Sequence, residues 1–160
     1  MQCPILREET DSEELSIEEE IEMCKSWKND EDKLTFIILS KELYDKNKDE
    51  VGAMIGDING FVHSDSIELS VMIAEKDYRK QGCAKEALKL MIKYCQIVLN
   101  FNNFFAIIND NNIKSIKLFN QLNFTITEKI EVFKQIKLSN NHIKIEDKLE
   151  LNYYETNNKT

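Results

Sequence analysis

The stretch that decides the fold is Arg79-Lys80-Gln81-Gly82-Cys83-Ala84, which joins a run typical of a strand to a run typical of a helix. The run before it, residues 67–74, is rich in apolar and β-branched residues. In the run after it, residues 84–99, apolar residues recur at helical spacing. A strand that turns straight into a helix points several main-chain N–H groups at one spot, and such a helix start binds anions. The junction therefore predicts a site that suits a pyrophosphate.

The residue types within this junction fit such a site. Gly82 can adopt backbone conformations that other residues avoid, and Ala84 is small enough for the helix start to approach a ligand. Arg79 and Lys80 add positive charge. Glycine occurs only at positions 52, 56, 60 and 82, so the chain has neither the Walker loop G-x-x-x-x-G-K-S/T nor the dinucleotide fingerprint G-x-G-x-x-G. Kinases and dehydrogenases that carry these motifs are excluded.

Upstream of the junction, the sequence predicts one helix and three strands. Ser16 and Glu19 form a capping box, and apolar residues at helical spacing follow as far as Trp27. Runs of strand type follow at residues 34–39, 53–62 and 67–74, with a charged loop at 41–50 between the first two. Three strands in a row favour an antiparallel meander.

Downstream of the junction, strands and helices alternate. After the long helix, residues 104–108 read as a buried strand and residues 115–122 as another helix. Further strands are expected at 124–127 and 130–138, with a last one near 149–154. The order of helix, three strands, helix, strand, helix and strands predicts an α/β (α+β) protein with a mixed sheet.

The composition fits one globular domain and excludes several partners. The chain has 160 residues, 42% of them apolar, with 21 basic and 29 acidic residues and a net charge of −8. Such a balance, without a cluster of basic and aromatic residues, predicts no nucleic-acid binding. No apolar run is long enough to span a membrane, and the acidic start differs from a signal peptide. We therefore expect no membrane contact and an intracellular, cytoplasmic location.

The cysteines and the chain ends complete this outline. Cys3, Cys24, Cys83 and Cys95 lie far apart and have no histidine near them, so we expect reduced thiols and no metal site. Residues 1–15 read as an acidic, disordered leader, residues 16–154 as the domain, and residues 155–160 as a frayed tail.

The junction resembles the acetyl-CoA site of the GCN5-related N-acetyltransferases (GNAT), which carries R/Q-x-x-G-x-G/A at this place. A second stretch, residues 112–124, looks like the N-x-x-S-x-x-x-Y/F-x-x-L-G-F element of that family. Within the family, the stretches at 15–18, 24–27, 35–39, 54–59, 67–75 and 132–135 look like the N-acetyltransferase 9-like branch. The resemblance runs from about Leu15 to Leu138.

The resemblance implies a GNAT-type fold, in which a mixed, mostly antiparallel sheet is flanked by helices. It also implies transfer of acetyl from acetyl-CoA to an amine by direct attack in a ternary complex, without a metal. The branch favours a protein or peptide acceptor, at a terminal amino group or a lysine. Two alternatives stay open: a non-catalytic module that binds CoA or a protein, and an acetyltransferase of small amines such as polyamines or aminoglycosides.

The resemblance also assigns residues to the cofactor. Those at the junction, Arg79, Lys80, Gln81, Gly82, Cys83 and Ala84, would hold the CoA pyrophosphate, mainly through main-chain N–H groups. Met72 and Ala74 would offer backbone partners to the pantetheine amides. Asn112 would lie near the CoA arm or cap the second helix. Phe119 stands where relatives often have a tyrosine that protonates the leaving thiolate, so here water or direct release of the thiolate would serve.

Two carboxylates are candidates for the catalytic work. Glu68 lies eleven residues before Arg79, where histone-acetylating relatives place a strand glutamate as the base. The alternative for Glu68 is a solvated strand residue. Asp57 and Asn59 share one face of the neighbouring strand and would line the acceptor pocket, unless Asp57 only shapes a turn or bulge.

The resemblance carries two further departures. Asn123 replaces the glycine that usually ends the second helix, a mild change because asparagine tolerates the left-handed conformation. The family fold normally begins with a strand and a helix before the element at Ser16, whereas here only the acidic residues 1–15 come before it. From this we expect part of the acceptor wall to be missing.

Overall fold

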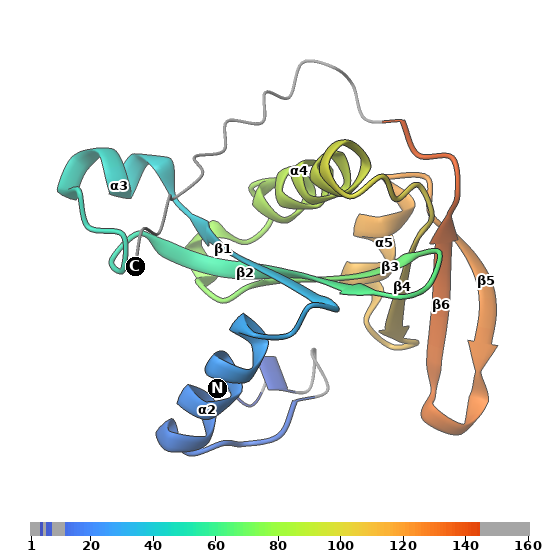
Figure 1. The fold of residues 1–160 in the computed structure, drawn as a ribbon, viewed down its shortest axis with the longest axis horizontal. Helices are drawn as coiled ribbons and strands as arrows, with labels where there is room; N and C mark the ends of the chain where they lie inside the picture. Colours follow the sequence, from blue (N-terminus) through green and yellow to red (C-terminus); the bar gives the residue numbers. More distant parts are fainter. Residues whose placement is uncertain (1–3, 5, 8–11, 145–160) are drawn as a thin grey trace.

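The computed structural model describes residues 4, 6, 7 and 12–144, which form a mixed sheet with helices on both faces (Figure 1). The sheet has six strands in the order β1-β2-β3-β4-β6-β5. They are β1 (Lys33–Leu39), β2 (Met54–Val62), β3 (Ile67–Ile73), β4 (Phe104–Asn109), β5 (Thr125–Ile130) and β6 (Gln135–Asn140). The helices are α2 (Ile17–Lys28), α3 (Lys41–Asn47), α4 (Cys83–Val98) and α5 (Ile113–Asn120). Two short 3-10 turns lie at Lys76–Tyr78 and Glu131–Phe133.

The pairing in the middle of the sheet is incomplete. Strands β1, β2 and β3 form the expected antiparallel meander, and β4, β6 and β5 form a second antiparallel set. The two sets meet through β3 and β4, which run parallel and pair only at Ile67 with Phe104 and at Glu68 with Phe105. Beyond these pairs the two strands separate. A gap therefore opens in the sheet toward the C-terminal end of β3.

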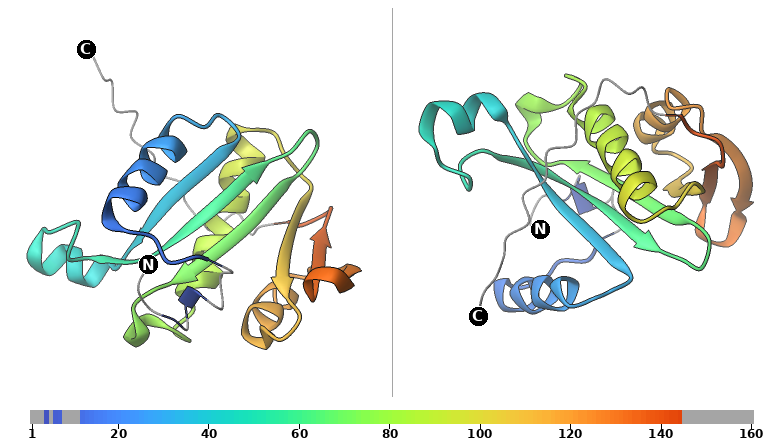
Figure 2. Two further views of the ribbon diagram at one scale, coloured as in Figure 1. Left: turned by 90° about the horizontal axis from the view of Figure 1, so that it is seen from below. Right: turned by 45° about the horizontal axis from the view of Figure 1, so that its top comes forward.

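Helices cover the two faces differently. α4 and α5 lie on one face, and α2 lies on the other, as both views in Figure 2 show. The core lies under α4, where the buried residues Leu88, Met91 and Ile92 belong to one cluster with Ile58 and Leu69 of the sheet. The amphipathic spacing in α4 produces this arrangement, because residues three and four apart share the face that packs on the strands.

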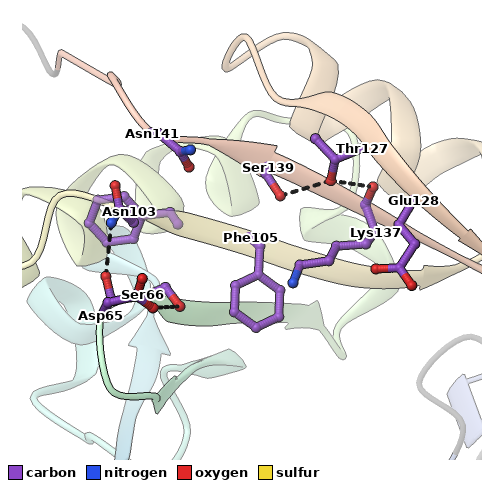
Figure 3. Close-up of a pocket in the computed structure, with 10 residues that line it drawn as sticks. Asp65, Ser66, Asn103, Phe105, Thr127, Glu128, Lys137, Ser139 and Asn141 are labelled. Carbon is purple, nitrogen blue, oxygen red and sulfur yellow. Dashed lines mark hydrogen bonds between the residues drawn. The ribbon is translucent and has the colours of Figure 1, made fainter.

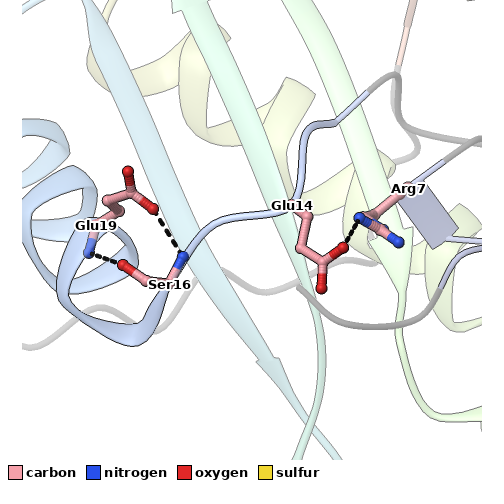
Figure 4. A network of polar contacts seen from close by, with 4 residues as sticks. All are labelled: Arg7, Glu14, Ser16 and Glu19. Carbon is pink, nitrogen blue, oxygen red and sulfur yellow. Dashed lines mark hydrogen bonds and ion pairs between the residues drawn. The ribbon is translucent and has the colours of Figure 1, made fainter.

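Helix α2 begins with the capping box that the sequence predicts. The Ser16 hydroxyl accepts from the main-chain N–H of Glu19, and the Glu19 carboxylate accepts from the main-chain N–H of Ser16, at 3.2 and 2.8 Å (Figure 4). This reciprocal capping lowers the pKa of Glu19, mainly through the bond from the Ser16 N–H. Just before it, Arg7 forms an ion pair with Glu14 at 2.7 Å.

The structure differs from the sequence-based expectations at two places. Residues 41–50, expected as a charged loop, contain α3, whose first turn is capped by the Ser40 hydroxyl. No apolar periodicity in the sequence indicates α3, because the helix is short and none of its residues is buried. Strand β5 extends to Ile130, and a 3-10 turn separates it from β6, so the expected strand at 130–138 begins later.

The chain ends bear on the remaining expectations. Leu6 is only 7% exposed, so this aliphatic side chain is buried, while the expectation of a disordered leader at 1–15 stays a prediction. The expected last strand near 149–154 and the tail at 155–160 lie outside the described residues. Within the described part of the chain, no helix is both long enough and apolar enough to cross a membrane.

Candidate active site

A cavity of about 500 Å³ lies where β3 separates from β4, beside the starts of α4 and α5. It collects residues from the end of β3, the junction and α5. The lining residues are Leu6, Val71, Met72, Ile73, Tyr78, Arg79, Lys80, Gly82, Cys83, Ala84, Lys85, Asn112, Lys114, Ser115, Lys117, Leu118 and Gln121. The two stretches singled out by the sequence, 79–84 and 112–124, thus meet at one cavity.

The start of α4 is open toward this cavity. Gly82 caps the helix in the left-handed region with φ of 93°, and a Cβ built there would meet nothing within 4 Å. Lys80 also has a positive φ, of 62°, so the chain turns sharply just before the helix. The first main-chain N–H groups of a helix have no partner within it. Here they begin a helix that borders the cavity, an arrangement that suits an anion.

Arg79 lines the cavity and is also hydrogen-bonded to the end of β3. Its guanidinium donates from Nε to the carbonyl of Ile73 at 2.9 Å and from Nη2 to the carbonyl of Ala74 at 3.0 Å. These bonds fasten the end of β3 to the junction that follows it. Gln81 is exposed, and its side-chain amide donates to the carbonyl of Asp77.

The main-chain N–H groups that face the gap belong to Val71 and Ile73, the neighbours of the predicted residues Met72 and Ala74. The N–H of Ala74 donates to the carbonyl of Ile55 in β2, whereas the N–H of Ile67 donates toward β4. Because successive N–H groups along a strand point in opposite directions, Met72 also points toward β2. Val71 and Ile73 therefore present their N–H groups to the gap, and they take the place that we expected for Met72 and Ala74.

The other two predicted residues, Asn112 and Phe119, belong to α5 and its N-terminal cap. Asn112 both caps and lines: its Oδ1 accepts from the N–H of Ser115 at 3.2 Å, and the residue borders the cavity. Phe119 differs from the expectation, because it is 3% exposed and packs edge-on against Phe124 within the core. The sequence analysis did not assign Ser115 and Leu118 to the site, although both line the cavity and the spacing of three residues from Asn112 to Ser115 and on to Leu118 makes each a neighbour of the one before.

The face of the sheet opposite α4 carries the two candidate carboxylates. Residues directly across from each other in the meander share a face, and the register pairs Asp57 with Met72 and Phe61 with Glu68. Glu68 is 26% exposed, and its carboxylate lies 3.6 Å from Nε2 of His63. The Asp57 carboxylate accepts from Nδ2 of Asn59 at 2.7 Å. The expected common face of Asp57 and Asn59 is confirmed, and Glu68 lies on the same face of the sheet.

The surroundings of Asp57 change its acidity. Burial raises the pKa of Asp57 above its ordinary value, while the bond from Asn59 and the charge of Lys33 act in the opposite direction. Lys33 lies with its ammonium 3.4 Å from the centre of the Trp27 ring, and burial lowers the pKa of Lys33. Asp57 is thus a partly buried carboxylate that holds a proton more readily than one in water.

A second cavity, of about 380 Å³, lies beyond the paired end of β3 and β4 (Figure 3). Its lining is polar, with Asn103 donating to the carbonyl of Asp65 and Thr127 bonded to Ser139 at 3.0 Å. The ammonium of Lys137 extends over the ring of Phe105, 4.1 Å from its centre. Glu68 pairs with Phe105 in the sheet, so this cavity begins next to one of the candidate carboxylates.

Comparison with known proteins decides the family. The family model described as an acetyltransferase (GNAT) domain matches residues 5–125. The chain belongs to the GNAT acetyltransferases. The central strands β3 and β4 of this GNAT protein separate beside the start of α4, and the family resemblance expected from the sequence is confirmed.

Individual relatives narrow the position within the GNAT family. The chain is 43% identical over 141 residues to the alpha/beta-tubulin-N-acetyltransferase 9 of Drosophila melanogaster, covering 83% of this chain and 70% of that protein. It is 41% identical over 162 residues to an N-acetyltransferase 9-like protein of Nematostella vectensis, covering 96% and 82%. The expected N-acetyltransferase 9-like branch is confirmed, and this GNAT protein is an N-acetyltransferase.

Solved structures confirm the fold of this GNAT protein. The crystal structure of Campylobacter jejuni N-acetyltransferase PseH in complex with acetyl coenzyme A superposes with a TM-score of 0.62 and 22% identity, covering 78% of each chain. A structure with this fold therefore binds acetyl-CoA. The expected mixed, mostly antiparallel sheet flanked by helices is confirmed as well.

Proposed function

We propose that this GNAT protein binds acetyl-CoA in the 500 Å³ cavity and transfers its acetyl group to a protein amine, by direct attack in a ternary complex. The observation that carries the proposal is the open start of α4 at Gly82, where the N–H groups of a helix start face unfilled space. The pyrophosphate binds there, at the main chain of Gly82, Cys83 and Ala84. The pantetheine arm follows the gap, where Val71 and Ile73 offer N–H groups to its amides.

Charge supports the same placement of the ligand. Five basic residues line the cavity: Arg79, Lys80, Lys85, Lys114 and Lys117. Although the whole chain is negative, these side chains make a local positive field for the phosphates of CoA. Asn112 holds the start of α5 against the arm, and Phe119 supports that helix from the core side.

The chemistry requires an amine that has lost a proton before it attacks the thioester carbonyl. We assign this work to the carboxylates of Glu68 and Asp57. The ammonium gives one proton to a carboxylate, and the freed nitrogen forms a bond to the carbonyl carbon. Main-chain N–H groups that face the gap stabilise the negative oxygen. The C–S bond then breaks with its electron pair going to sulfur, the nitrogen gives its second proton to water, and the thiolate takes a proton from water.

The names of the relatives support a protein acceptor. The Drosophila relative is named for acetylation of α- and β-tubulin and shares 43% of aligned residues with this chain. We extend that substrate class to this protein: the acceptor is a terminal amino group or a lysine of tubulin. The polar cavity next to Glu68 suits a peptide more than a small apolar amine, because hydroxyl, amide and charged groups line it.

The test incubates the whole chain and acetyl-CoA with purified αβ-tubulin, and locates added acetyl groups by mass spectrometry. Spermidine is the matched small-amine substrate. We expect acetylated tubulin peptides and slower CoA release with spermidine. Turnover of spermidine without tubulin acetylation would contradict the protein acceptor, and no CoA release with any amine would contradict acetyl transfer itself.

Two further parts of the proposal concern the chain as a whole. We place the acetyltransferase domain at residues 16–154, because the strands and helices described from residue 17 onward form the sheet and both sides of the cavity. We place the protein in the cytoplasm. The thiols of Cys24, Cys83 and Cys95 are free, which is typical of reducing compartments.

A further inference from the structure

We propose that Thr35 and Asn59 are positioning residues, which hold the Asp57 carboxylate as the group that takes the proton from the acceptor amine. This inference rests on the proposed function, and it chooses between the two carboxylates of that function. Three side chains on two neighbouring strands form one chain of hydrogen bonds: the hydroxyl of Thr35 donates to Oδ1 of Asn59 at 2.7 Å, and Nδ2 of Asn59 donates to Oδ2 of Asp57 at 2.7 Å.

The direction of these bonds is fixed by chemistry. An ionised carboxylate only accepts, so the Asn59 amide must turn its nitrogen toward Asp57. The amide oxygen of Asn59 then faces Thr35, and the hydroxyl of Thr35 must donate to it. Asn59 is only 7% exposed, which makes the loss of either bond costly because the amide has little access to water. The Asp57 carboxylate therefore decides which end of the amide it meets, and the bond from Thr35 holds the amide in that orientation.

The register places Asp57 closer to the gap than Glu68. Asp57 lies across from Met72, between the two residues of β3 whose N–H groups face the gap. Glu68 lies at the end where β3 and β4 are still paired, beside His63. An acetyl group at the gap is therefore nearer to Asp57 along the sheet, and Glu68 is left to pair with cationic groups of the acceptor.

Charged groups from several elements surround this site. Lys33 reaches Asp57 from β1 and favours the ionised form. Glu68 lies on the same face of β3, and on the side of the sheet where α2 lies, Arg7 has its charge matched by Glu14. Burial of Asp57 acts against the charge of Lys33 and raises the pKa of Asp57. The bond from Asn59 thus offsets part of the burial and keeps the carboxylate available as a base near neutral pH.

A loss of the Thr35 hydroxyl has a defined consequence. Without that donor, the Asn59 amide is held at one end only, and its hydrogen bond to the Asp57 carboxylate is less firmly fixed. The pKa of Asp57 then rises further, because the bond to the charged form favours ionisation less. More of the enzyme is protonated, and inactive, on the acidic side of its pH range.

The test measures kcat/KM for acetyl transfer to a tubulin peptide as a function of pH in three variants. In Thr35→Val the shape is kept and the hydroxyl is lost, and Thr35 is exposed, so folding is expected. We expect about a tenfold loss at acidic pH that diminishes as pH rises, as for a lost bond to a charged group. Thr35→Ser should restore the profile, and Thr125→Val, on exposed β5, is the matched control that leaves it unchanged.

Other outcomes overturn the inference. An equal loss of activity at every pH in Thr35→Val, or no rescue in Thr35→Ser, would show a structural role only. A wild-type profile in Thr35→Val would show that Asn59 does not depend on the hydroxyl. Failure of the proposed function is distinguishable, because then the wild-type protein itself would transfer no acetyl group to the peptide.

Discussion

Gly82 has two properties that no other residue type combines at this position. Its φ of 93° strains any L side chain, and the space in front of it is open. For Gly82→Val we expect binding of acetyl-CoA to weaken by about thirtyfold, or about 2 kcal/mol, because the added methyl groups would occupy the approach of the pyrophosphate. Isothermal titration calorimetry with acetyl-CoA measures this loss.

The control for Gly82→Val must share the backbone strain without touching the cavity. Asn100 has φ of 59° and lies in the loop after α4. Asn100→Val should lose stability by a comparable amount, about 1–2 kcal/mol for a left-handed non-glycine residue, yet keep its affinity. Unchanged affinity in Gly82→Val would reject the assignment of the pyrophosphate to this helix start.

The ionised Asp57 carboxylate is expected to lower the stability of the fold while it supports activity. Because burial raises its pKa in the folded state, its ionised form destabilises the fold, and the protein is relatively more stable when Asp57 is protonated. That stability is present below the ordinary value of 3.8 and is lost as pH rises through the folded pKa. For Asp57→Asn we expect a higher Tm at neutral pH, no gain in strong acid, and a fall in kcat of roughly a hundredfold or more.

Differential scanning calorimetry at several pH values, with activity in parallel, checks the variant Asp57→Asn. Glu50→Gln is the control, since Glu50 is exposed and lies outside both cavities. Its Tm and its activity should follow those of the wild type. A lower Tm for Asp57→Asn at neutral pH, or full activity, would contradict the role of Asp57.

Single residues differ in how far the sequence could place them. Gly82 and Asn112 were predictable because a left-handed turn and a helix cap each depend on neighbours within a few positions. The bonds from Thr35 through Asn59 to Asp57 depend on the register of β1 against β2, which sequence spacing does not encode. The packing of Phe119 was out of reach for a similar reason: its partner Phe124 lies beyond the end of the helix.

At the scale of elements, the end of β3 depends on one side chain. Arg79 donates to the carbonyls of Ile73 and Ala74, and its planar fork reaches both at once. For Arg79→Lys we expect a loss of stability of about 1–3 kcal/mol, because one ammonium cannot satisfy both carbonyls in this geometry. Faster hydrogen exchange confined to the end of β3, together with weaker binding of acetyl-CoA, would be the signature.

The comparison variant for Arg79→Lys is Lys89→Arg on α4, an exchange of the same two residue types in the reverse direction. Lys89 lies outside the junction, so exchange at β3 and the affinity should stay those of the wild type. If Arg79→Lys also matched the wild type, the two hydrogen bonds would not be what holds the end of β3.

The elements themselves were predictable to different degrees. α4 and the capping box of α2 follow from local patterns, namely apolar spacing and a serine with a glutamate three residues later. α3 carries no such pattern, because its stability comes from the Ser40 cap and not from a buried face. The separation of β3 from β4 was also out of reach, since pairing that stops after Glu68 is set by both strands together.

At the scale of the whole molecule, the negative charge of the chain repels an anion such as CoA, except at the cavity. The chain has a net charge of −8, and CoA is itself an anion. Lysines at positions 80, 85, 114 and 117 border the cavity, so the local field there has the opposite sign to the distant field. Salt screens interactions between exposed charges beyond about 8 Å at physiological ionic strength, which removes the distant repulsion first.

This arrangement makes the salt dependence of binding informative. For the double variant Lys114→Gln and Lys117→Gln, we expect several-fold weaker acetyl-CoA binding at low salt and a smaller loss of affinity as salt increases. Both effects follow because the attraction being screened has been removed, while the helix start at Gly82 remains. The matched double variant Lys129→Gln and Lys144→Gln removes two exposed lysines outside the cavity and so has the same net charge as the first double variant. Calorimetric titrations at three salt concentrations compare the slopes, and equal slopes in the two double variants would show that net charge, not the lysines of α5, governs CoA binding.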